Sequence, residues 1–106
     1  MSVLCQRNDV FKNFYEQNHG VFAQILTLKF QQSLSHNGEY YWIGGMLGSW
    51  QVSMKGCADG AILMCVDGET YYMKQSEVLM LLETFLRTMS VTDEFFDILD
   101  RNAVQN

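Results

Sequence analysis

The sequence predicts an α+β protein with an N-terminal helix, an antiparallel meander of four or five strands, and two C-terminal helices. Apolar residues recur at helical spacing near both ends of the chain, whereas apolar and polar residues alternate in the middle. Asn-Gly and Asp-Gly pairs separate the alternating segments, and such pairs favour the two-residue turns of β-hairpins. The 106 residues suit one domain. We therefore expect residues 1–106 to fold as a single unit.

The first expected helix covers residues 8–18. Its apolar side chains lie three or four residues apart and make one stripe, which consists of Val10, Phe11, Phe14 and Tyr15. The tripeptide Asn18-His19-Gly20 is typical of a helix end, because glycine readily adopts the left-handed backbone that follows a last helical turn. We therefore expect Gly20 to terminate this helix.

Residues 21–34 allow two interpretations. As a helix, they place Phe22, Leu26 and Phe30 on one side. As a strand, Leu26, Leu28 and Phe30 alternate with polar residues. The pair Asn37-Gly38, directly before the aromatic run 39–43, favours the strand, since Asn-Gly between apolar segments is a strong hairpin signal. We expect a strand over 24–34, with one helix running from 8 to 34 as the alternative.

Further strands are expected at 49–55, 61–66 and 69–74. Apolar and polar residues alternate over 49–55, which predicts a strand with one buried and one solvent-exposed side. Residues 61–66 are apolar throughout, as in a strand that is covered on both faces. Asp59-Gly60 and Asp67-Gly68 supply the turns. The glycines of Gly44-Gly45-x-x-Gly48 indicate a bend or bulge between strands, rather than a phosphate-binding loop before a helix.

The C-terminal third is predicted to hold two helices. Ser76 is expected to cap the first, which carries a stripe of apolar residues that consists of Val78, Leu82, Phe85 and Met89. Thr92 is expected to cap the second, with Asp93 and Glu94 in its first turn, where carboxylates favour the helix dipole. Phe95, Phe96 and Leu99 are then expected to face the core.

Composition restricts the function classes. The net charge of −5 and the pI near 4.7 argue against binding of nucleic-acid phosphates. An export signal and an apolar run near 18 residues are both missing from the sequence, which predicts a cytoplasmic protein that does not enter a membrane. The cysteines at 5, 57 and 65 form no CxxC pair, so we expect reduced thiols and no disulfide framework.

No catalytic, metal-binding or cofactor-binding set is predicted. Cys57 or Cys65 with His19 or His36 would be needed for a thiol nucleophile, and no family signature surrounds them. Cys65 lies in the most apolar strand, where a thiol is expected to be inert. The histidines are too far apart in sequence for zinc-ligand spacing. We therefore expect no cofactor and no enzyme activity.

Two groups of residues are candidates for binding a protein. Tyr40, Trp42 and Tyr72 lie in runs of consecutive aromatics, which cannot all face one side of a strand. Outward tyrosine and tryptophan are typical anchors of interfaces, although aromatic pairing across strands is an equal alternative. The second group consists of the acidic residues of the last helix, Asp93, Glu94, Asp97 and Asp100. They form either a docking surface for a basic partner or an ordinary solvent-exposed surface.

The sequence thus favours a non-catalytic protein-binding module that acts on a larger protein. The apolar strand 61–66 would leave Ile62, Met64 and outward tyrosines exposed unless something covers them. A homodimer is expected to do so, with another protein or a longer first helix that wraps the second face as the alternatives. In size, acidity and helix–sheet–helix layout the chain resembles secretion chaperones and the small inhibitors made by phages and mobile elements. The likeness is one of general type. The chaperones place a helix between their strands, and this sequence predicts no such helix. The alternatives are a small enzyme or ligand-binding domain with a pocket between sheet and helices, and a structural subunit of an assembly.

Overall fold

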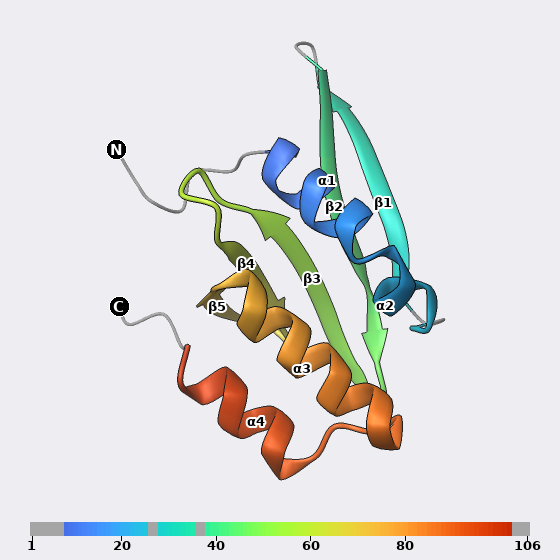
Figure 1. Cartoon of the computed structure of the whole chain (residues 1–106), viewed down its shortest axis with the longest axis vertical. Coiled ribbons are helices and arrows are strands. Elements are labelled where there is room, and N and C mark those ends of the chain that lie inside the picture. The colour runs from blue at the N-terminus through green and yellow to red at the C-terminus, as the bar shows by residue number, and fades with distance from the viewer. Residues whose placement is uncertain (1–7, 26–27, 36–37, 103–106) are drawn as a thin grey trace.

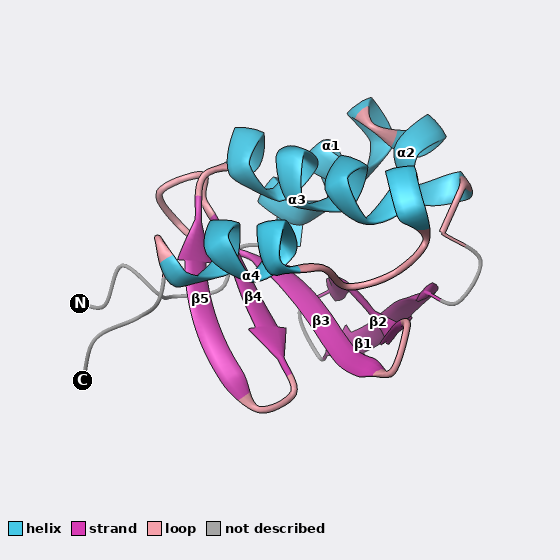
Figure 2. Cartoon of the chain, turned by 90° about the horizontal axis from the view of Figure 1, so that it is seen from below, coloured by secondary structure: helices cyan, strands magenta, loops and turns pink. Residues whose placement is uncertain are grey.

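The structure is a computed structural model that describes the backbone of residues 8–25, 28–35 and 38–102, and the side chains of 9–25 and 43–102. A five-stranded sheet forms one layer, and the described helices form a second layer on one of its faces (Figures 1 and 2). The elements in chain order are α1 (Asn8–Gln17), α2 (His19–Ala23), β1 (Leu28–Ser35), β2 (Gly38–Leu47), β3 (Trp50–Gly56), β4 (Ile62–Val66), β5 (Glu69–Met73), α3 (Gln75–Thr88) and α4 (Asp93–Asp100).

The sheet is an antiparallel meander in which spatial order equals chain order, β1-β2-β3-β4-β5. This confirms the predicted α+β arrangement. The β4–β5 turn is the predicted Asp67-Gly68, and both residues have positive φ, 51° and 91°. Two consecutive residues with positive φ match the right-handed twist of the flanking strands, which is why Asp-Gly is favoured at such turns.

The other connections differ in detail from the prediction. Gly44 and Gly45 lie within β2 rather than in a bend, and the β2–β3 turn is Gly48-Ser49, with φ of 60° at Gly48. In the β3–β4 loop only Gly60 has positive φ, because three residues, not two, separate Cys57 from Ala61. Gly38 pairs with Ser35 in the sheet, whereas Asn37 of the predicted Asn37-Gly38 turn lies outside the described residues.

The core lies between the sheet and the helix layer. Alternate residues of β3 and β4 point into it, and α3 and α4 contribute their apolar stripes. Phe11, Phe14 and Phe22 from the two N-terminal helices form an aromatic cluster, with ring centroids 5.9 to 6.2 Å apart. Burial of these side chains is the main source of stability of such a two-layer domain.

The N-terminal segment corrects two expectations. α1 ends at Gln17, one residue before the predicted end, and Gly20 is not a left-handed stop, because it lies inside the short helix α2. The side-chain amide of Asn18 instead donates to the carbonyl oxygen of Phe14 at 2.9 Å, and this bond satisfies the end of α1. β1 begins at Leu28 rather than at residue 24, because α2 and its C-cap Gln24 occupy the start of the segment; the continuous helix over 8–34 is wrong.

The C-terminal helices confirm one predicted cap and correct another. The Thr92 hydroxyl accepts a hydrogen bond from the backbone N–H of Phe95 at 3.4 Å, as an N-cap does. Ser76 is not a cap, because α3 begins at Gln75 and its N-cap is Lys74, which makes no side-chain capping bond. Met89 does not extend the apolar stripe of α3: it ends the helix in left-handed conformation and is 56% exposed.

Among the described helices, none combines the length and the apolar composition that crossing a bilayer requires.

Candidate functional site

The face of the sheet opposite the helix layer is covered by none of the described elements (Figure 2). We call it the open face. Its described positions are those that alternate with the buried residues of β2 to β5 and pair with one another across the strands. They are Gly44, Met46, Gln51, Ser53, Lys55, Leu63, Cys65, Thr70 and Tyr72.

The centre of the open face combines apolar and basic side chains. Leu63 of β4 lies directly opposite Lys55 of β3 and Tyr72 of β5 in the register. Leu63 and Tyr72 are half-buried, whereas Lys55 is exposed. Directly opposed side chains contact each other across a sheet, so these three residues form a continuous row. Such a row can bind a partner through its apolar centre while lysine remains in contact with water.

β4 corrects the expected position of the unsatisfied apolar surface. Ile62 and Met64 were expected to face a partner, but both are fully buried beneath the helices. The residues between them in sequence, Leu63 and Cys65, occupy the open face and are half-buried. The apolar run therefore places apolar side chains on both sides of β4. The prediction was wrong about which of them face outward.

The predicted aromatic candidates have different outcomes. Tyr72 lies on the open face, and Tyr71 faces the core beside Met64. The backbone of Trp42 pairs with Lys55 and with Gln31, and Tyr40 lies two residues earlier on β2. The register therefore assigns both strand positions to the same side of the sheet as Lys55. The side chains of Tyr40 and Trp42 are outside the described ones.

The charge on the open side of the sheet is opposite in sign to that of the whole chain. Lys55 is exposed there, and Lys74 is exposed where extended backbone continues the alternation beyond the buried Met73. The β1 position that pairs with Gly44 on this side is Lys29. The strand positions on this side, read from the register of β1 to β5, contain no aspartate or glutamate. A chain of net charge −5 thus has lysine and no carboxylate at the strand positions of this side.

The outer edge of the sheet at β5 is held by Asn102, two residues beyond the end of α4. The backbone N–H of Tyr72 donates to the carbonyl oxygen of Asn102 at 3.1 Å. The Asn102 side-chain amide in turn donates to the carbonyl oxygen of Ile98 at 2.8 Å and to Glu77 Oε1 at 3.2 Å. Asn102 therefore connects β5, α3 and α4, and occupies part of an edge that could otherwise pair with another strand.

The predicted acidic residues lie in the helix layer. Asp93, Asp97 and Asp100 are exposed on α4, while Phe95, Ile98 and Leu99 anchor this helix in the core. The structure therefore does not bring the acidic and the aromatic candidates together. They lie on opposite sides of the sheet, so one small partner surface cannot contact both groups at once.

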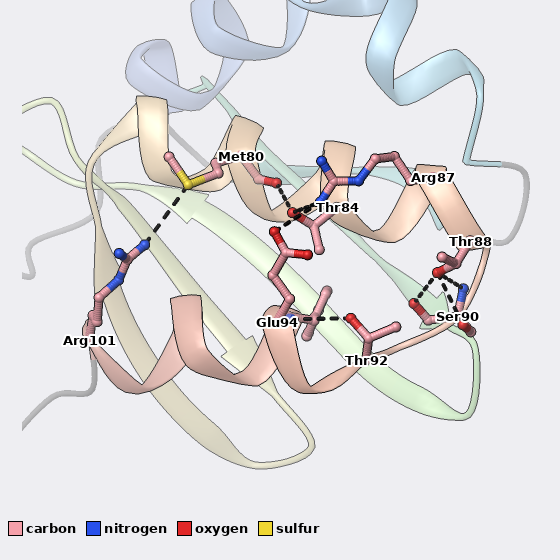
Figure 3. A network of polar contacts seen from close by, with 9 residues as sticks. Met80, Thr84, Arg87, Thr88, Ser90, Thr92, Glu94 and Arg101 are labelled. Carbon is pink, nitrogen blue, oxygen red and sulfur yellow. Dashed lines mark hydrogen bonds and ion pairs between the residues drawn. The ribbon is translucent and has the colours of Figure 1, made fainter.

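Ion pairs divide the acidic group. Arg87 Nη2 lies 2.9 Å from Glu94 Oε2 and also contacts the hydroxyl of the buried Thr84 at 3.4 Å (Figure 3). Arg101 Nη2 lies 3.5 Å from Glu77 Oε1. These two arginines thus offset the charges of Glu94 and Glu77. Asp93, Asp97 and Asp100 have no ion pair with another described residue, and their charge is available to a partner.

Of the two described cysteines, Cys57 is the buried one. Burial, and then the neighbouring Asp59, raise the pKa of Cys57 above its ordinary value. Burial, followed by Glu69, Asp100 and Cys65, raises the pKa of Tyr71. A thiol with a raised pKa is a weak nucleophile at neutral pH. Cys65, which was expected to be buried in the most apolar strand, is instead half-buried on the open face.

Among the described side chains, no three histidine, cysteine, aspartate or glutamate residues are placed to hold one metal ion. Asp93, Asp97 and Asp100 are spaced along the exposed side of α4 and do not converge.

The chain was compared with known proteins at three levels. No protein-family model, no curated protein and no solved structure matches it. The function must therefore be argued from the physical character of its surfaces.

Proposed function

We propose that the protein is a non-catalytic binding module that docks on a larger protein through the open face of its sheet. The observation that carries this proposal is the row Lys55, Leu63 and Tyr72, in which an apolar centre is bordered by a positive charge on an uncovered sheet. Interfaces commonly combine an apolar and aromatic centre with a polar rim.

Several features of the row support this role. Leu63 and Tyr72 are fixed on neighbouring strands, so they lose little conformational freedom when a partner binds. The Tyr72 strand is further held by the bond from its N–H to Asn102. A rigid, partly apolar surface of this kind needs no rearrangement to receive a complementary surface.

The proposal is tested by affinity capture from the native host with two open-face variants, Leu63→Ser and Tyr72→Ala. A matched control, Gln17→Ala, changes an exposed residue of α1 in the helix layer. The wild type and the control are expected to retain the same larger protein, whereas both open-face variants lose most of it. Circular dichroism confirms that each variant is folded. Equal capture by all four proteins would remove the open face from the proposal.

A further inference from the structure

We infer that the open face binds the acidic surface of α4 from a second copy, so that the chain assembles head to tail. This inference rests on the proposed docking role of the open face and identifies an occupant for it. The acidic surface is defined by Asp93, Asp97 and Asp100.

The two surfaces are complementary in charge. The open side of the sheet carries Lys55 and has no carboxylate among its strand positions, and the exposed Lys74 directly follows β5 in extended backbone. The acidic surface of α4 carries three aspartates outside the ion pairs of the described residues, because Arg87 and Arg101 are paired with Glu94 and Glu77. Opposite potentials steer two such surfaces together, and like charges disfavour face-to-face or helix-to-helix contact.

The helix layer also offers an apolar contact beside the aspartates. Met80 of α3 is 45% exposed, and its sulfur lies 3.9 Å from Arg101 Nη2, next to α4 (Figure 3). A thioether is flexible and adapts to an aromatic or aliphatic surface. Met80 can therefore pack on the Leu63–Tyr72 row of the second copy while Asp97 and Asp100 approach the lysines. An apolar centre and a charged rim are thereby present on both surfaces.

The positions of the two surfaces determine the symmetry. They lie on opposite layers of the molecule, because α4 buries Phe95 and Leu99 on the side of the sheet away from the open face. A twofold dimer pairs one surface with itself and would here bring like charges together. A contact between two different surfaces leaves one of each unoccupied and so continues to further copies. The expected product is a growing chain or a ring.

Sedimentation velocity on the full chain is the first test, at about 20 mM and about 500 mM salt, where the Debye length falls from roughly 20 Å to roughly 4 Å. At low salt the average mass is expected to rise with protein concentration, and at high salt it should return to that of one chain. Lys55→Gln/Lys74→Gln and Asp97→Asn/Asp100→Asn should each lower the association constant roughly tenfold. The control Asn13→Asp/Gln17→Glu, which changes net charge by the same −2 as the lysine variant, should associate as the wild type does.

Mixing the two interface variants provides a sharper test. The lysine variant keeps the acidic surface, and the aspartate variant keeps the open face, so together they can form only one intact contact. A species of two chains should appear in the mixture and in neither variant alone. A wild type that stays monomeric at low salt would overturn the inference, as would a mixture without the two-chain species or a dimer that both variants retain.

The outcome is separable from the proposed function. If another protein binds the open face while the chain alone remains monomeric, the docking role stands and the second copy is not the occupant. If the chain assembles as described but Leu63→Ser and Tyr72→Ala capture the same proteins as the wild type, the head-to-tail contact stands and docking on a larger protein fails.

Discussion

Two adjacent residues of β4 allow a direct test of which side of the sheet is covered. Met64 is fully buried in the core, whereas Leu63 is half-buried on the open face. Truncation of Met64 to alanine removes buried apolar surface and leaves a cavity, which together cost about 3 kcal/mol of unfolding free energy. Leu63→Ala removes surface that is only partly buried and opens no enclosed cavity, so its cost is about 1 kcal/mol.

Urea denaturation followed by far-UV circular dichroism measures both changes. With a slope of about 1.5 kcal/mol/M, the expected losses lower the midpoint by about 2 M for Met64→Ala and by less than about 1 M for Leu63→Ala. Because both variants place alanine in the same strand, the effect of alanine on strand propensity largely cancels. High salt and low protein concentration keep any association from contributing to the measured stability.

Equal losses in the two variants would refute this reasoning. Such a result would mean that Leu63 is buried as deeply as Met64 in the isolated chain, and the open face could then not be a docking surface. A larger loss for Leu63→Ala would reverse the assignment of the two sides of β4.

Three further predictions concern the ends of elements and the titrating groups. Thr92→Ala removes the N-cap of α4 and should lower the unfolding free energy by about 1 kcal/mol in urea titrations, whereas Thr92→Ser should retain most of the capping free energy. An alanine variant as stable as the wild type would show that the cap contributes nothing. Asn102→Ala removes the two hydrogen bonds that its side chain donates and so loosens the carbonyl group that accepts from the Tyr72 N–H. Exchange of the Tyr72 amide hydrogen should then accelerate severalfold in NMR hydrogen exchange. Unaltered exchange would argue against Asn102 as the support of β5. The folded-state pKa values of Cys57 and Tyr71 are raised above their ordinary values of 9.0 and 10.0, so the folded state holds these protons more tightly. The contribution of these two groups to the unfolding free energy is therefore expected to be constant at neutral pH and to be lost as the pH rises above about 9 and through the raised pKa values. The double variant Cys57→Ala/Tyr71→Phe should show a smaller decline in melting temperature over this pH range.

Local signals in the sequence predicted most of the secondary structure. Alternation identified β3, the Asp67-Gly68 pair identified a turn with two positive φ values, and Thr92 identified the start of α4. Each of these features depends on residues that are neighbours in the chain. The errors at Gly20 and Ser76 arose where tertiary contacts decided between two acceptable local choices, such as a helix end at residue 18 followed by another short helix.

The candidate binding residues were predicted less completely. Tyr72 was identified because two consecutive tyrosines on a strand must face opposite sides. Lys55 and Leu63 were not, since neither residue is unusual in its own strand. Their importance depends on the register, which places them in one row with Tyr72. A helix covering one side of the sheet then determines whether that row is core or surface.

Apart from the short helix α2, the sequence by itself determined the order of helices and strands, the excess of negative charge and the acidic surface of α4, because propensity, turn chemistry and charge are properties of the residues. Only the tertiary structure decided that Ile62 and Met64 belong to the core and Leu63 to the open face. An entirely apolar strand suits either orientation, and its orientation is decided by the two neighbouring strands and the helices that pack on it. The register of the sheet likewise placed Lys55 beside Leu63 on the uncovered side of an acidic protein.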